Sequence, residues 1–137
     1  MEHWNLQGCD PKLLSTGTLA FLGDAVYELF VRQKLVETAN LPVNKLHLLA
    51  VERVRASFQS DAVAIIEPHL SEEELSVWKR GRNANGVKAP KNANPAEYRR
   101  ATGLEALFGY LFLQGRMERL EELFTMIMNS NDEKSEA

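Results

Sequence analysis

The sequence predicts a single all-α domain, and three observations lead to this class. Apolar residues recur at helical spacing along most of the 137-residue chain. No segment shows the strict alternation of apolar and polar residues that is typical of a half-buried strand. The length suits one hydrophobic core and leaves little room for a second. We therefore expect one domain over residues 1–137, with its core at about 11–128 and a disordered polar tail at 129–137.

The first half of the chain predicts two or three helices. Residues 17–31 carry Leu19, Leu22 and Val26 at helical spacing. Pro42 then interrupts the pattern, because proline lacks the backbone N–H that a helix interior needs. The periodicity resumes over residues 43–66, as one helix or as two, and it ends before the next proline.

The second half predicts three further helices. Ser71 and Glu74 have the spacing of a capping box, so a helix should run from there to about Arg82. Residues 81–95 are rich in Gly, Asn and Pro and predict a long loop. A helix at about 96–114, started by Pro95, and a last helix at 117–128 should follow, separated by a glycine.

Composition excludes several classes of protein. The one cysteine, Cys9, rules out an internal disulfide and a cysteine-rich zinc site. No apolar run approaches the ~18 residues of a membrane span, and the N-terminus lacks the pattern of a signal peptide. We expect a cytoplasmic protein with no membrane partner.

A net charge of −3 conceals a strongly basic segment. Residues 79–100 alone carry +6, so the rest of the chain carries −9. An acidic protein with one basic stretch is expected to bind a polyanion at a defined place. The alternative is a solvated loop with surplus Lys and Arg, and the charge run by itself does not decide between the two.

The helix at 18–31 contains only two charged residues before its end, Asp24 and Glu28. Its other positions are apolar nearly all round, which predicts a buried helix and a desolvated Asp24. A carboxylate in that position needs a cation, a metal ion or several hydrogen-bond donors. Gly23 costs about 1 kcal/mol in a helix interior, which indicates that another backbone approaches closely there.

The helix at 96–114 repeats this pattern. Between residues 101 and 113 its only charge is Glu105, and Gly103 and Gly109 again permit close packing. If the two helices pack together, Asp24 and Glu105 could meet and form a site for a hard cation such as Mg²⁺. The alternative is that each acid pairs with an arginine or caps a neighbouring helix.

Two segments resemble the ribonuclease III family. They are LAFLGDAV at 19–26, similar to the family's signature Glu-Phe-Leu-Gly-Asp-Ala, and TGLEALFG at 102–109, similar to its Asp-x-x-Glu-Ala-x-x-Gly block. Together with GRNA at 81–84 and YRRATG at 98–103, the whole resembles the Mini-ribonuclease III family of stand-alone bacterial nuclease domains. The likeness covers about residues 11–128 and leaves no room for the usual domain that binds double-stranded RNA.

The resemblance implies a helical nuclease domain that dimerises through its signature helix. It further implies an endoribonuclease in which each subunit cuts one strand of duplex RNA and leaves short 3′ overhangs. The implied substrate is precursor large-subunit (23S) ribosomal RNA, with a ribosomal protein as a possible helper.

By the same resemblance, Asp24 and Glu105 are the catalytic acids that bind Mg²⁺, with Mn²⁺ as a substitute. The family's two further carboxylates are replaced here by Ala20 and Thr102. We therefore expect one well-held ion, with Glu28 and Thr102 as auxiliary groups. The residues expected to contact RNA are Arg82, Lys88, Lys91, Arg99 and Arg100.

Two other functions compete with the nuclease. A ribonuclease III fold that has lost its chemistry would bind RNA as a scaffold, and the absent acids at residues 20 and 102 favour this reading. A helical protein-interaction module would explain the apolar helices but would leave the basic segment unexplained. Metal-dependent cleavage distinguishes the nuclease from both.

Overall fold

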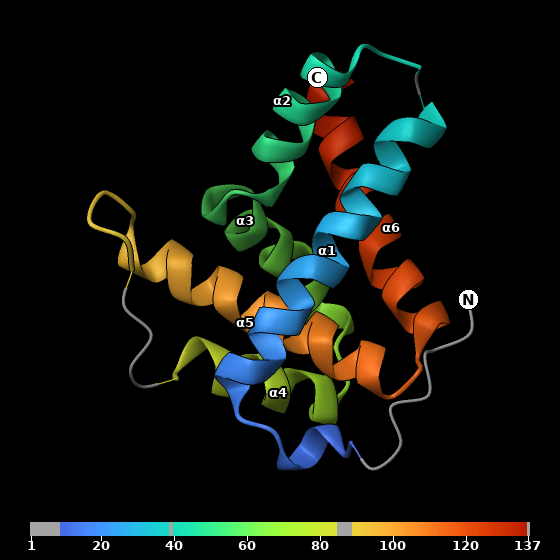
Figure 1. Ribbon diagram of the computed structural model, residues 1–137. Coiled ribbons are helices and arrows are strands. Elements are labelled where there is room, and N and C mark those ends of the chain that lie inside the picture. The colour runs from blue at the N-terminus through green and yellow to red at the C-terminus, as the bar shows by residue number, and fades with distance from the viewer. Residues whose placement is uncertain (1–8, 39, 85–88, 137) are drawn as a thin grey trace.

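The computed structural model confirms the all-α class. It describes residues 9–38, 40–84 and 89–136, and this part of the chain forms six α-helices and no strand (Figure 1). Two short 3₁₀ helices are also present: Pro11–Leu13 precedes the first α-helix, and Glu67–His69 lies between the third and the fourth. The α-helices are α1 (Thr16–Thr38), α2 (Val43–Val54), α3 (Ala56–Ile66), α4 (Glu72–Arg82), α5 (Pro95–Leu113) and α6 (Met117–Glu136).

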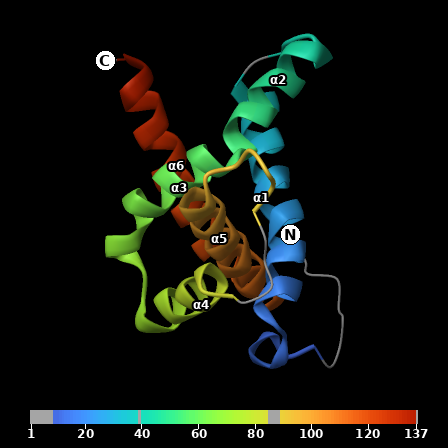
Figure 2. The same ribbon diagram turned by 90° about the vertical axis from the view of Figure 1, so that its left-hand side faces the viewer.

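Helix α5 is the centre of the fold. It packs against α1, α3, α4 and α6, and Figure 1 shows α1 crossing it. The apolar stripe of α5 is fully buried, with Leu104, Leu107, Phe108 and Leu111 at 0% exposure. In Figure 2, α5 is seen nearly end-on, surrounded by the other helices. Because α5 is apolar on most of its surface, it lies at the centre of the hydrophobic core.

Two glycines let α1 and α5 cross in direct backbone contact. A Cβ atom on Gly23 would overlap the carbonyl oxygen of Glu105, and one on Gly109 would overlap the carbonyl oxygen of Leu19. Any side chain at either position would therefore push the helices apart. This crossing places Asp24, the residue after Gly23, beside α5.

The structure confirms most of the predicted helix boundaries. Ser71 and Glu74 form both hydrogen bonds of the capping box, and Asn94 caps α5 immediately before Pro95. The 43–66 segment is two helices, separated at Arg55, whose extended backbone (ψ 155°) breaks the hydrogen-bond ladder. Gly115, at φ +72°, separates α5 from α6.

Two expectations differ from the structure. Helix α6 runs to Glu136 rather than ending at residue 128, because polar residues without proline or glycine do not stop a helix. Helix α1 is not buried all round: Phe21 is 83% and Leu29 53% exposed. No described element covers this outer face of α1. No helix in the described ranges is long and apolar enough to cross a membrane.

Candidate active site

The crossing of α1 and α5 brings the two predicted acids together. Asp24 lies near Glu105: its charge and a side-chain hydrogen bond with it both act to raise the pKa of the Glu105 carboxyl. Their helices approach at Gly23, whose missing Cβ makes room for the Glu105 backbone. The two residues are far apart in the sequence, so this pairing depends entirely on the helix crossing.

The two acids have different surroundings. Asp24 is exposed, so the prediction that this side chain is desolvated is wrong for the described chain. Glu105 is mostly buried instead. Burial and the nearby charge of Asp24 raise the pKa of Glu105 from 4.5 to about 8, while a hydrogen bond from Gln59 acts in the opposite direction.

No arginine or lysine in the described part of the chain forms an ion pair with either acid. The alternative in which each acid is neutralised by its own guanidinium is therefore not found. Glu28, the auxiliary candidate one turn beyond Asp24, does have such a partner: its carboxylate contacts Arg32 at 3.1 Å on the surface. Asp24 and Glu105 thus form a pair of carboxylates without a cation.

Sequence reasoning missed Gln59, a residue of α3 that is only 2% exposed. Its Nε2 donates to the carbonyl oxygen of Val54 (2.9 Å) and, at 3.5 Å, to Oε2 of Glu105. The signal that could have found it is a polar residue among the apolar positions of a short helix. Nearby, the Tyr27 hydroxyl donates to the carbonyl oxygen of Arg53 (3.0 Å), which ties α1 to the end of α2.

The two positions where the resembled family has further acids lie one turn before the pair. Ala20 precedes Asp24 on α1, and Thr102 precedes Glu105 on α5. Both are buried, and the Thr102 hydroxyl donates to the carbonyl oxygen of Tyr98 at 2.9 Å. That bond uses the hydroxyl proton and leaves the oxygen able to accept a hydrogen bond.

The oxygen donors of this site fit one Mg²⁺ ion that leaves most of its coordination positions to water and phosphate. They are two carboxylates and, beside Glu105, the carbonyl oxygen Oε1 of Gln59, which is buried and accepts no hydrogen bond from the described residues. No group of three or more His, Cys, Asp or Glu side chains within the described ranges is arranged so that it could hold a metal ion. Mg²⁺ uses one or two carboxylates and leaves its other positions to water and phosphate, so a site this sparse suits it.

The predicted RNA contacts divide into exposed and anchored cations. Lys91 and Arg99 are exposed, whereas Arg100 donates to the hydroxyl (3.0 Å) and the carbonyl (3.2 Å) of Ser60. Arg82 stacks over the Trp78 ring at 4.8 Å. Lys88 lies outside the described residues. The segment 89–94 and the start of α5 project on one side of the molecule (Figure 1).

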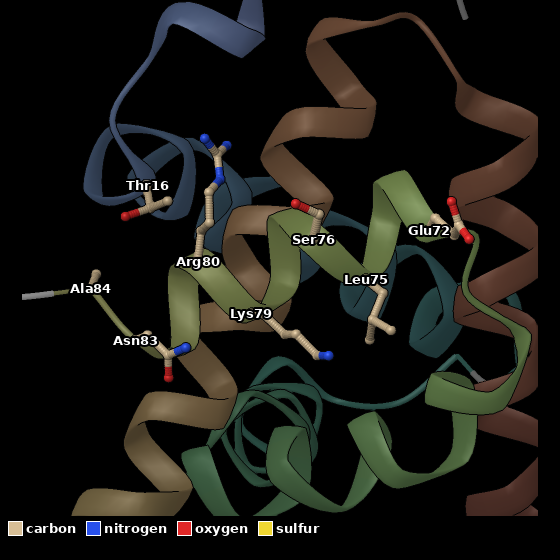
Figure 3. Close-up of a pocket in the computed structure, with 8 residues that line it drawn as sticks. All are labelled: Thr16, Glu72, Leu75, Ser76, Lys79, Arg80, Asn83 and Ala84. Atoms are coloured by element: carbon tan, nitrogen blue, oxygen red, sulfur yellow. The ribbon is translucent and has the colours of Figure 1, made fainter.

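An open hollow lies between the start of α1 and α4, next to the basic segment (Figure 3). Thr16, Lys79, Arg80 and Asn83 are among the residues that line it, and the side chains of Lys79 and Arg80 point in different directions there. Neither acid of the pair lines this hollow. Asp24 instead faces solvent on an open surface, which suits a large polymer better than an enclosed small molecule.

Comparisons with known proteins identify relatives over most of the chain. Residues 17–116 match the model of the ribonuclease III domain. A Mini-ribonuclease 3 from Symbiobacterium thermophilum is 50% identical over 114 residues, covering 83% of this chain and 88% of that protein. A Mini-ribonuclease 3 from Clostridium tetani is 41% identical over 128 residues, covering 93% of this chain and 85% of that protein.

A solved structure shares the fold. A crystal structure of a Fusobacterium nucleatum protein superposes with a TM-score of 0.80 at 29% sequence identity. The match covers 89% of this chain and 98% of that one, so it includes nearly the whole helical arrangement.

Proposed function

Because the chain belongs to the ribonuclease III family, in its Mini-ribonuclease 3 branch, we propose that it is an Mg²⁺-dependent endoribonuclease that cuts double-stranded RNA and matures precursor 23S ribosomal RNA. The observation that carries the metal dependence is the Asp24–Glu105 pair, two adjacent carboxylates without a counter-ion. Such a pair is expected where a divalent cation binds.

In this mechanism Asp24 and Glu105 hold the ion, and Mn²⁺ can replace Mg²⁺. When bound, the ion supplies an activated water for in-line attack on a backbone phosphorus and neutralises charge on the phosphoryl oxygens. Asp24, being exposed, faces the substrate side, and the hydrogen bond from Gln59 orients the buried Glu105. Neither acid is the nucleophile.

Phosphate contacts in this proposal come from the basic segment. Lys91 and Arg99 are exposed near the start of α5, and Lys88 precedes them in the chain. Duplex RNA is recognised mainly through its shape and its phosphates, because the A-form major groove is too narrow for side chains. The cleavage position therefore depends on RNA geometry, and a ribosomal protein that shapes the precursor would serve as helper.

The outer face of α1 supports a homodimer. Phe21, Ala25 and Leu29 form an exposed apolar stripe on the helix that carries Asp24. Covering this stripe with a second copy would bury it and place two active sites on one duplex. Phe21→Glu should yield a folded monomer by light scattering, whereas Leu13→Glu, at the same 83% exposure, should remain dimeric. A wild-type monomer at all concentrations would refute the dimer.

Cleavage of a structured precursor-rRNA duplex tests the function itself. Wild-type protein should cut both strands with Mg²⁺ and neither strand with EDTA. Asp24→Asn should bind the duplex and leave it intact. If the wild-type protein binds the RNA but cuts it neither with Mg²⁺ nor with EDTA, the scaffold function replaces the nuclease.

A further inference from the structure

The carboxamide of Gln59 has one satisfied side and one unsatisfied side. Its Nε2 donates to Val54 O and Glu105 Oε2, and both partners are acceptors. The amide therefore cannot be flipped, because a carbonyl oxygen in the Nε2 position would face two other oxygens. This leaves Oε1 as a buried acceptor with no donor among the described residues.

A buried acceptor without a donor is rare in folded proteins, and a bound water or ion is a common explanation. Gln59 is 98% buried and held at its Nε2 atom, so it cannot turn Oε1 toward bulk water. Oε1 and Nε2 are bonded to the same carbon, and Nε2 contacts Glu105. The unsatisfied oxygen is therefore a near neighbour of the acid pair.

A purely structural role explains the hydrogen bond of the Gln59 Nε2 atom to Val54 but not the surroundings of its Oε1 atom. The Nε2 bond to Val54 O satisfies a carbonyl at the end of α2, which is ordinary helix capping. Capping does not use Oε1 and does not require a contact with Glu105. The unsatisfied Oε1 atom, which lies beside the Glu105 carboxylate, therefore needs another partner.

We propose that Gln59 is a positioning residue of the divalent-cation site, which holds Glu105 with its amide N–H and accepts a hydrogen bond from the hydrated cation at Oε1. The inference rests on the proposed function, since it requires a cation at Asp24 and Glu105. It adds an uncharged oxygen to a site that has lost two carboxylates at residues 20 and 102. Groups that orient metal ligands typically contribute about 10- to 100-fold to metal affinity.

Calorimetric titration of the full chain with Mn²⁺ and with Mg²⁺ tests the role without relying on activity. Gln59→Leu should bind either ion at least about tenfold more weakly than the wild type. Gln59→Glu keeps an oxygen at this position, so it should bind Mn²⁺ at least as tightly as the wild type. Its melting temperature should fall without metal, because three carboxylates then repel, and should recover more on adding Mn²⁺ than that of the wild type.

Gln114→Leu is the matched control. Gln114 also has a buried Oε1 without a described donor, but it lies nine residues beyond Glu105, roughly 13 Å along α5 at 1.5 Å per residue. This control should bind both ions like the wild type. If Gln59→Leu does the same, Gln59 is only a cap and the inference is wrong.

Other outcomes are equally distinct. If Gln59→Leu does not fold, Gln59→Glu decides: a gain in melting temperature on adding Mn²⁺ no larger than that of the wild type overturns the inference. If the wild type itself binds neither ion, the proposed metal-dependent function fails, which is a different result from the failure of Gln59 alone.

Discussion

Two glutamates of this protein, the fully buried Glu74 and the partly buried Glu105, have opposite surroundings. Glu74, on α4, is 0% exposed, and both of its oxygens accept from Arg119 at 2.8 Å, while the backbone N–H of Ser71 donates to it as well. Burial alone would raise the pKa of Glu74, but these partners keep it below its usual value. Glu105 faces another carboxyl, that of Asp24, and its pKa is raised to about 8.

The comparison separates an acid whose charge is neutralised within the fold from an acid that has no such partner. The fold supplies Glu74 with a guanidinium and a helix cap, so the charge is neutralised within the chain. It supplies Glu105 with a second acid and one amide N–H. A buried carboxyl that has no counter-charge within the folded protein is expected to have a partner from outside it.

The largest expected effect is on catalysis. Asp24→Asn and Glu105→Gln should each lower the rate of RNA cleavage by about a thousandfold, since metal-ion catalysis contributes several kcal/mol and each ~1.4 kcal/mol is tenfold. Neither variant should lower the melting temperature, because each removes repulsion between the two carboxyls. Single-turnover cleavage and thermal melting measure the two effects. If both variants retain cleavage, Glu105 has no role in catalysis and does not differ from Glu74 in this respect.

The second effect is on stability. Arg119→Met leaves Glu74 buried without its cation and should lower the free energy of unfolding by about 3–5 kcal/mol in urea titrations. Arg116→Met is the matched control, because Arg116 contacts the same carboxylate only at 3.9 Å and is 43% exposed. That control should change the unfolding free energy by less than about 1 kcal/mol. Mn²⁺ affinity should be unchanged in both, and a loss of affinity in Arg119→Met would contradict the separation of roles.

The third effect is on pH dependence without metal. Between pH 4.5 and about 8, Glu105 holds a proton in the folded chain that it has lost in the unfolded chain. Its contribution to stability is therefore complete below about pH 4.5 and is lost as the pH rises through 8. Glu74, whose pKa is lowered, stabilises the fold above the usual carboxyl pKa and less as the pH falls through its own.

Urea unfolding in EDTA from pH 4 to 9 measures this difference. Glu105→Gln should remove a decrease in stability of up to about 1.4 kcal/mol per pH unit between about pH 4.5 and 8. An identical pH profile in wild type and Glu105→Gln would show that the carboxyl titrates normally.

The smallest expected effect concerns two neighbouring arginines, one exposed and one held in place by the fold. Arg99 is exposed, whereas Arg100 is held by Ser60. Arg99→Ala should weaken duplex binding and reduce the slope of log affinity against log salt by about 1, with an unchanged melting temperature. Arg100→Ala should lower the melting temperature by removing its bonds to Ser60. The reverse pattern would mean that the anchored arginine is the one that contacts RNA.

The helices themselves could be predicted because their signals are local. The capping box at Ser71, the proline at the start of α5 and the apolar stripe of α5 each act within a few residues. The outer face of α1 and the end of α6 could not be predicted. Which side of α1 is covered depends on what packs there, and polar residues after 128 carry no stop signal.

The candidate site was predicted in part. Asp24 and Glu105 stand out because each is an isolated acid in an apolar helix that contains glycine. Which of them is buried depends on the geometry of the crossing, and the sequence favours the wrong one. Gln59 and the anchoring of Arg100 by Ser60 depend on contacts between residues 40 or more positions apart, which no local pattern reports.

The most direct test of a shared cation site is the anomalous scattering of Mn²⁺ in crystals of the wild-type protein. We expect one strong peak per chain in contact with carboxylate oxygens of both Asp24 and Glu105, and none beside Glu74. A peak bound by other residues, or no peak between these two acids at saturating Mn²⁺, would contradict this expectation.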